Sequence, residues 1–223
     1  MMTNLFSTFD PATSMNVSMN WMSSLTSLLL IPLTFWALPS RISFIGSTVN
    51  KTLHEEFKML MGPASTGMTL VMITMFNYIF INNIMGLLPY IFTSSSHLAF
   101  SMTLALPLWL STMLYGWTNK TNSMFSHLVP SGTPAALMPF MVIIETVSNL
   151  IRPGSLAVRL TANMIAGHLL MSLLGNNTIS VSNIILPLIM IIQMMLMMFE
   201  TAVAIIQAYV FSVLSTLYTS EVI

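Results

Sequence analysis

The segment from Leu150 to Leu170, LIRPGSLAVRLTANMIAGHLL, decides how the rest of the sequence is interpreted. It places Arg159 inside an apolar run that is long enough to enter a lipid bilayer. A positive charge at the centre of a membrane helix costs about 2.5–3.5 kcal/mol on insertion scales, so it usually faces a partner or a water-filled cavity. Arginine keeps its proton at every accessible pH, so Arg159 can impose a fixed field but cannot carry protons itself. The alternative is a structural ion pair with a glutamate of another helix.

The composition is that of a membrane protein. The 223 residues are 55% apolar and only 5% charged, whereas soluble domains carry about 25% charged residues. The net charge is zero and there is no basic run, which argues against a nucleic-acid partner. The chain has no cysteine, no metal-ligand spacing, no nucleophile with its base and no glycine-rich phosphate loop. We therefore expect no cofactor, no metal and no catalytic site.

Hydropathy predicts an all-α membrane protein with five transmembrane helices and one interfacial amphipathic helix, in a single membrane domain over residues 1–223. The first three spans are expected over 21–38, 66–88 and 98–117. Over 42–61, apolar residues recur at helical spacing and charged residues fall elsewhere on the wheel, which favours an interfacial helix over a solvated loop. Asn82 and Asn83 lie inside the second span, where hydrogen bonds between helices are the ordinary explanation.

Two longer apolar segments, 137–174 and 180–218, are predicted to form a tilted hairpin with a short break at Gly175-Asn176-Asn177. As a helix, each is about 57 Å long, almost twice the hydrocarbon thickness. Such helices must tilt or bend, and Pro153-Gly154 and Pro187 are positions where they could do so. Residues 119–134, which precede the hairpin, are predicted to be a loop.

Five crossings place 41–58, Lys120 and the C-terminus on one side of the membrane. The loops at 89–97 and 175–179 then lie on the other side and contain no lysine or arginine. This distribution agrees with the positive-inside rule and predicts that the N-terminus is outside and the C-terminus inside.

Two rows of polar side chains run along the hairpin at intervals of seven residues, which places each row on one face of a helix. The rows are Glu145, Arg152 and Arg159 on the first helix, and Gln193, Glu200 and Gln207 on the second. Such rows suggest facing surfaces that line a path or meet another protein. Because two glutamates and two arginines cancel in charge, an internal salt-bridge network is the alternative.

His168 lies on the opposite side of its helix from Arg159. A buried histidine is often an ordinary core residue. Its combination with Glu200 favours a proton relay, because both groups titrate and such chains are typical of proton paths in membranes.

Two motifs, LAVRLTANMIAGHLL (Leu156–Leu170) and FETAVAIIQAYVFSVL (Phe199–Leu214), closely resemble subunit a of the F-type ATP synthase, mitochondrial type, and INNIMGLLPY (Ile81–Tyr90) fits the same family. The resemblance covers essentially the whole chain. It implies a stator subunit that provides two offset proton half-channels against a rotating ring of proteolipid c subunits, so that proton flow drives ATP synthesis. It also implies the mitochondrial inner membrane, with the N-terminus in the intermembrane space, the C-terminus in the matrix, and neighbours from the membrane sector and peripheral stalk.

The same resemblance assigns roles to individual residues. Arg159 matches the family's essential arginine, which faces the ring carboxylate; Glu200 and His168 match the intermembrane-space channel, and Glu145 the matrix-side exit. Asn163 and Gln207 resemble polar lining near the arginine, and Tyr209 is a candidate for the same role. Some members of the family carry an uncharged residue at the position of Arg152. Three roles are therefore equally compatible with it: snorkelling to the membrane surface, pairing with Glu145, and a part in the proton path. The alternative from another class is a stand-alone secondary transporter or ion channel, although no inverted repeat is visible.

Overall fold

The protein is described by a computed structural model that covers residues 5–13, 17–31, 38–62, 67–129, 132–134, 137–178 and 184–222. Within these ranges the fold is entirely helical, with seven α-helices, three short 3-10 helices and no β-strand. The predicted all-α class is therefore confirmed.

Among the described residues, four helices are long and apolar enough to cross a membrane. They are α3 (Met68–Leu87), α4 (Leu98–Asn119), α6 (Met138–Asn177) and α7 (Leu186–Val222). Where a span is expected over 21–38, the structure has the 3-10 helix η2 (Met19–Met22) and the short helix α1 (Ser23–Leu30). Residues 32–37 of this expected span lie outside the described residues, so the count of five crossings is not confirmed.

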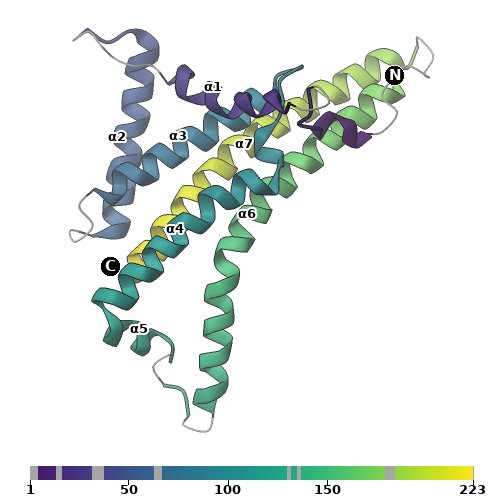
Figure 1. Cartoon of the computed structure of the whole chain (residues 1–223). Helices are drawn as coiled ribbons and strands as arrows, with labels where there is room; N and C mark the ends of the chain where they lie inside the picture. Colours follow the sequence, from purple (N-terminus) through teal and green to yellow (C-terminus); the bar gives the residue numbers. More distant parts are fainter. Residues whose placement is uncertain are drawn as a thin grey trace.

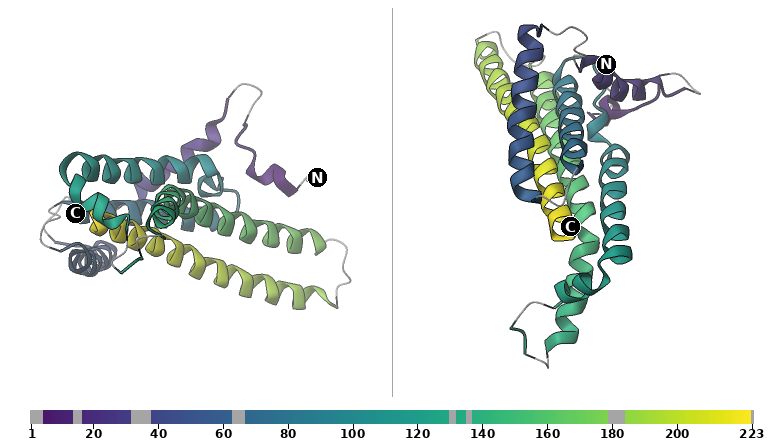
Figure 2. Two further views of the ribbon diagram at one scale, coloured as in Figure 1. Left: turned by 90° about the horizontal axis from the view of Figure 1, so that it is seen from below. Right: turned by 90° about the vertical axis from the view of Figure 1, so that its left-hand side faces the viewer.

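The four long helices form one bundle, in which α3 packs on α7, α4 packs on α6 and α7, and α6 packs on α7 (Figures 1 and 2). Large apolar side chains such as Met72, Ile79 and Leu160 fill its interior. Fully buried Ala157, Ala204 and Ala208 occupy positions where helices meet, since small residues let membrane helices approach closely.

Asn82 and Asn83 of α3 make the predicted contacts between helices. Asn82 Nδ2 donates to Ser27 Oγ of α1 over 3.3 Å, and Asn83 Nδ2 donates to the carbonyl oxygen of Ala204 in α7 over 3.4 Å. Both side chains are buried, so these bonds satisfy donors that have no access to water.

Helix α2 (Arg41–Met61) covers the residues expected to form the amphipathic helix. Its Ser40 N-cap accepts a hydrogen bond from the backbone N–H of Ser43, which stabilises the first turn. The C-terminal half packs against α3 and α7, burying Leu53, Phe57 and Met61 (Figure 1). Apolar residues of the N-terminal half are exposed.

Helices α6 and α7 form the predicted hairpin and extend side by side beyond the rest of the bundle (Figure 2). Helix α6 changes direction along its length (Figure 1), and buried Pro153 within it provides the cause, because proline removes a backbone hydrogen bond and kinks a helix. Pro187 does not bend α7, because it is the second residue of that helix, where a missing N–H costs nothing.

Two predicted connections differ from the structure. The break expected at Gly175-Asn176-Asn177 is wrong, because α6 continues through Asn177. The loop expected over 119–134 contains a helix, α5 (Thr121–His127), which packs against α4. Seven residues between polar turns give too weak a periodicity for this helix to be recognised in the sequence.

Candidate functional site

Three cavities lie along the α6–α7 hairpin in the described part of the chain, and its polar side chains can be grouped by the cavity that they line. The Glu200 cavity, about 490 Å³, lies between the two helices and is lined by Asn163, Gly167, His168, Glu200 and Gln207 among others. The Phe9 cavity, about 770 Å³, shares His168 with it. The Arg152 cavity, about 480 Å³, lies elsewhere on α6 and is lined by Glu145, Arg152, Tyr218 and Glu221 with the end of α4.

Glu200 is a buried carboxylic acid on the face of α7 that meets α6. Its side chain is only 8% exposed, and Oε1 has no hydrogen-bond partner among the described residues. An unpaired polar atom of this kind is uncommon, because burying it without a partner costs free energy. Glu200 therefore brings to its cavity a carboxylate oxygen that no described residue satisfies.

Gly167 makes the room that the Glu200 side chain needs. A Cβ at position 167 would lie 2.7 Å from Glu200 Oε1 and 2.8 Å from its Cδ, both closer than real Cβ contacts. Only glycine allows α6 to approach the carboxylate this closely. Gly167 was not predicted from the sequence, although it directly precedes His168.

His168 connects two cavities. Its ring lines both the Glu200 cavity and the Phe9 cavity, and its buried Nε2 has no hydrogen-bond partner in the described part of the chain. The Phe9 cavity continues along α6 to Gly175 and Asn176 and along α7 to Gln193. Polar groups thus run from the end of the hairpin, past His168, to the buried acid.

Arg159 lies on a different face of α6. Its neighbours Leu156, Ala157 and Leu160 are buried in the bundle, whereas the Arg159 side chain is exposed. The structure gives Arg159 no hydrogen bond or ion pair with any residue that it describes. The structural alternative of an internal ion pair therefore fails for Arg159 within the described ranges.

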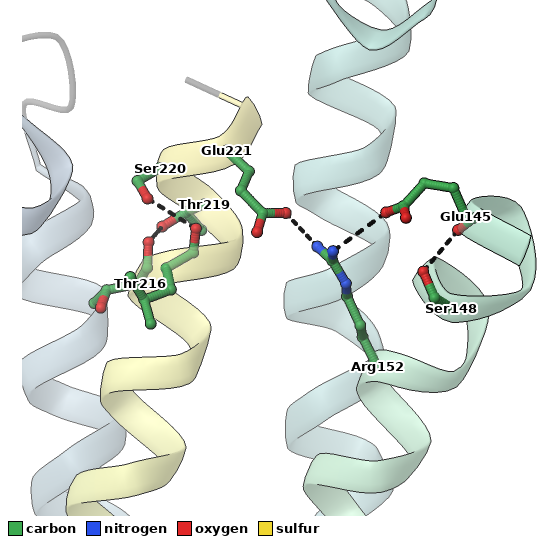
Figure 3. A network of polar contacts seen from close by, with 8 residues as sticks. Glu145, Ser148, Arg152, Thr216, Thr219, Ser220 and Glu221 are labelled. Atoms are coloured by element: carbon green, nitrogen blue, oxygen red, sulfur yellow. Dashed lines mark hydrogen bonds and ion pairs between the residues drawn. The ribbon is translucent and has the colours of Figure 1, made fainter. Parts of the chain in front are cut away.

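The charges of the Arg152 cavity are paired (Figure 3). The guanidinium of Arg152 lies between Glu145 of its own helix, at 3.4 Å, and Glu221 at the end of α7, to which it also forms an ion pair. It also lies over the ring of Tyr218, 5.0 Å from its centroid. Arg152 therefore pairs with Glu145, as one of the sequence interpretations holds, and joins α6 to the C-terminal turn of α7.

The six site residues predicted from the sequence fall into three places. Four of them line the Glu200 cavity: Asn163, His168, Glu200 and Gln207. Glu145 lines the separate Arg152 cavity, and Arg159 lines none of the three. Tyr209, considered as further lining, is absent from the Glu200 cavity and donates a hydrogen bond to Glu56 of α2 over 3.1 Å.

The described residues contain no group of three or more histidine, aspartate or glutamate side chains that could hold a metal ion. The arrangement instead offers titratable side chains: a buried acid, a histidine that lines the same cavity, and a paired cluster further along the hairpin. Fold and site together define a multi-pass membrane protein with titratable groups along two long helices.

Comparisons with known proteins assign this architecture to a family. The family described as "ATP synthase A chain" matches residues 13–220. The chain is 62% identical to ATP synthase subunit a of Aedes aegypti, 60% identical to that of Anopheles gambiae and 59% identical to that of Drosophila melanogaster, in each case over the full length of both chains. The chain belongs to the ATP synthase subunit a family.

Membership in this family confirms the resemblance found in the sequence motifs. The chain is a membrane-sector component of the F-type ATP synthase and takes part in proton transport and ATP synthesis. The alternative of a stand-alone transporter or channel is not favoured. Its partners include other membrane-sector components of the complex.

Proposed function

We propose that the chain provides two offset half-channels for protons and holds them against a rotating ring of proteolipid c subunits. The observation that carries this proposal concerns α6. Arg159 is exposed and has no ion-pair partner among the described residues, whereas one group of cavity residues precedes it along the helix and another follows it. Along a helix, Arg159 is about 21 Å from Glu145 and about 14 Å from His168. A fixed positive charge thus separates two sets of proton-exchanging groups.

The first half-channel follows the Phe9 and Glu200 cavities. Protons reach His168 from the end of the hairpin, pass to Glu200, and leave for a carboxylate of the ring, with Asn163 and Gln207 lining the path. The shared position of His168 in both cavities supports this order. So does the missing partner of Glu200 Oε1, because a relay group must be free to gain and lose hydrogen bonds as its proton moves.

The second half-channel releases protons through the Arg152 cavity. Glu145 accepts them from the ring side, and Arg152 joins this part of α6 to the end of α7 through its ion pairs with Glu145 and Glu221. Arg159 performs no proton transfer, because arginine cannot be deprotonated in a protein. Its charge favours the ionised ring carboxylate and repels a proton moving directly between the half-channels. A direct leak would waste about 2.3 kcal/mol per proton for each 100 mV of membrane potential.

We further propose the mitochondrial inner membrane as the location, with the N-terminus in the intermembrane space and the C-terminus in the matrix. The chain forms one membrane domain with 21–38 as an additional crossing. The distribution of lysine and arginine between the loops supports this orientation. Its neighbours are the c-ring, other membrane-sector subunits, the peripheral stalk and lipid, and it has no catalytic site of its own. Exposed apolar side chains along α7 support a contact with ring or lipid: Met194, Met195, Met198, Phe199, Ile205 and Ile206.

The experiment that tests this proposal replaces Arg159 by alanine in the assembled complex. Arg159→Ala should abolish ATP-driven proton pumping into membrane vesicles while the complex still assembles, because the exposed side chain makes no hydrogen bond or ion pair with the described residues. Arg152→Ala, which changes the other arginine of α6, is the matched control and should retain pumping. Normal coupled pumping in Arg159→Ala would contradict the proposed mechanism.

A further inference from the structure

The 3-10 helix η1 (Leu5–Phe9) packs against α6 beside the end of the hairpin (Figure 1). We propose that η1 is a wall of the proton-uptake path and that Phe9 is a positioning residue that holds the imidazole of His168 between its two cavities. This inference rests on the proposed function, because it assigns a role to Phe9 in the path through His168. It extends that path to a segment far from the hairpin in sequence.

The contact between the two rings is specific in geometry. The ring centroids of Phe9 and His168 are 6.4 Å apart and the ring planes are 77° from parallel, an edge-to-face arrangement that aromatic pairs prefer. Phe9 and its neighbour Thr8 also line the Phe9 cavity, together with Tyr90 from the connection after α3 and Gln193 from α7. The N-terminal segment thus closes one side of the space that leads to His168.

Hydrogen bonds do not fix the His168 ring at Nε2. That buried atom has no partner among the described residues, so packing against Phe9 contributes to holding the ring in its orientation. Apart from His168, the titratable residues that line its two cavities are Glu200 of α7 in one and Tyr90 in the other. Helix η1 contributes no titratable side chain to either cavity, and Asp10, which follows it, is exposed.

The same short helix contains a matched control. Phe6 lies three residues before Phe9 but is 69% exposed, lines neither cavity and makes no ring contact with His168. Phe6→Ala therefore controls for the loss of an exposed phenylalanine from the same short helix, whereas Phe9→Ala also removes the ring contact with His168.

The first test measures proton flux in the assembled complex. Phe9→Ala should lower the flux about two- to tenfold, the range expected when one aromatic pair is removed. Phe9→Tyr should restore it, and Phe6→Ala should leave it unchanged. An unchanged flux in Phe9→Ala, or an equal loss in Phe6→Ala, would overturn the inference.

The second test asks whether Phe9 acts through His168. In a His168→Asn background, Phe9→Ala should cause no additional loss of flux, because the ring that it positions is gone. A second, additive loss would overturn the positioning role. A normal flux in His168→Asn alone would instead contradict the proposed path.

The third test asks whether η1 is a wall of the Phe9 cavity and does not measure flux. It therefore distinguishes a failure of this inference from a failure of the proposed proton path. The chain has no natural cysteine, so Ser172→Cys places one thiol of this subunit in the Phe9 cavity. A charged, membrane-impermeant thiol reagent should label Cys at this position faster in Phe9→Ala complexes than in complexes with Phe9 intact. Equal labelling rates would show that η1 is not a wall of this cavity.

Discussion

The Glu200 cavity and the Arg152 cavity both contain carboxylates from the same hairpin, but these carboxylates differ in their burial and in their partners. Glu200 is buried and one of its oxygens has no partner among the described residues. Glu145 and Glu221 are partly exposed and share one guanidinium, that of Arg152. The Glu200 carboxylate therefore has one oxygen without a partner in the described chain, whereas the carboxylates of Glu145 and Glu221 are both held by ion pairs. The comparison indicates that the two ends of the hairpin are not interchangeable.

The largest difference should appear when one acid in each cavity is neutralised. Glu200→Gln removes a proton-exchanging group with no neighbouring acid in its cavity, so proton flux should fall about 100-fold or more and its pH profile should change. Glu145→Gln should cost much less, because Glu221 remains beside Arg152. Both fluxes are measured as ATP-driven acidification of vesicles with equal amounts of assembled complex. Equal losses in the two variants would remove the distinction between the cavities.

A smaller but specific effect is expected at Gly167. In Gly167→Ala the new methyl group displaces the flexible end of the Glu200 side chain, and flux should fall about tenfold, as misplaced reacting groups lose efficiency. Gly154→Ala on the same helix is the control, because nothing lies within 4 Å of a Cβ there. A normal flux in Gly167→Ala would show that the position of the Glu200 carboxylate is not critical.

Arg152→Ala should affect stability more than transport. Loss of the guanidinium separates the end of α7 from α6 and should ease local opening by about 1 kcal/mol, the upper range for a partly exposed ion pair. Hydrogen exchange of the backbone over 216–222 measures this opening. Unchanged exchange, or a complete loss of pumping as expected for Arg159→Ala, would contradict the assigned role.

The smallest effect is expected for Tyr209→Phe. The hydroxyl donates to exposed Glu56 and lines no cavity of the hairpin, so its removal should cost less than about 1 kcal/mol and leave flux unchanged. A strongly reduced flux would place Tyr209 in the path after all, as the sequence motif permits.

Sequence reasoning recovered the helical class and the long hairpin, because both depend on continuous apolar segments with a clear helical period. It did not recover α5, and it placed a break at Gly175-Asn176-Asn177 that the structure replaces with helix. Polar residues at a helix end resemble a turn in sequence, and packing decides between the two.

The candidate site was recovered in part. An interval of seven residues placed Glu200 and Gln207 on one face of α7, and the structure brings both to one cavity with Asn163 and His168. The same interval grouped Arg159 with Glu145 and Arg152, yet these residues separate across the bend in α6. Phe9, Gly167 and Glu221 were missed, because their roles depend on contacts with residues that are distant in sequence.

We propose that the two ends of the hairpin open to opposite sides of the membrane, and labelling of single cysteines from each side measures this. The chain has no cysteine, so Ser172→Cys reports the Phe9 cavity and Asn149→Cys reports the Arg152 cavity. An impermeant thiol reagent is applied to sealed vesicles of either orientation that contain the assembled complex. We expect Ser172→Cys to be labelled only from the intermembrane-space side and Asn149→Cys only from the matrix side. Labelling of both positions from the same side would contradict it.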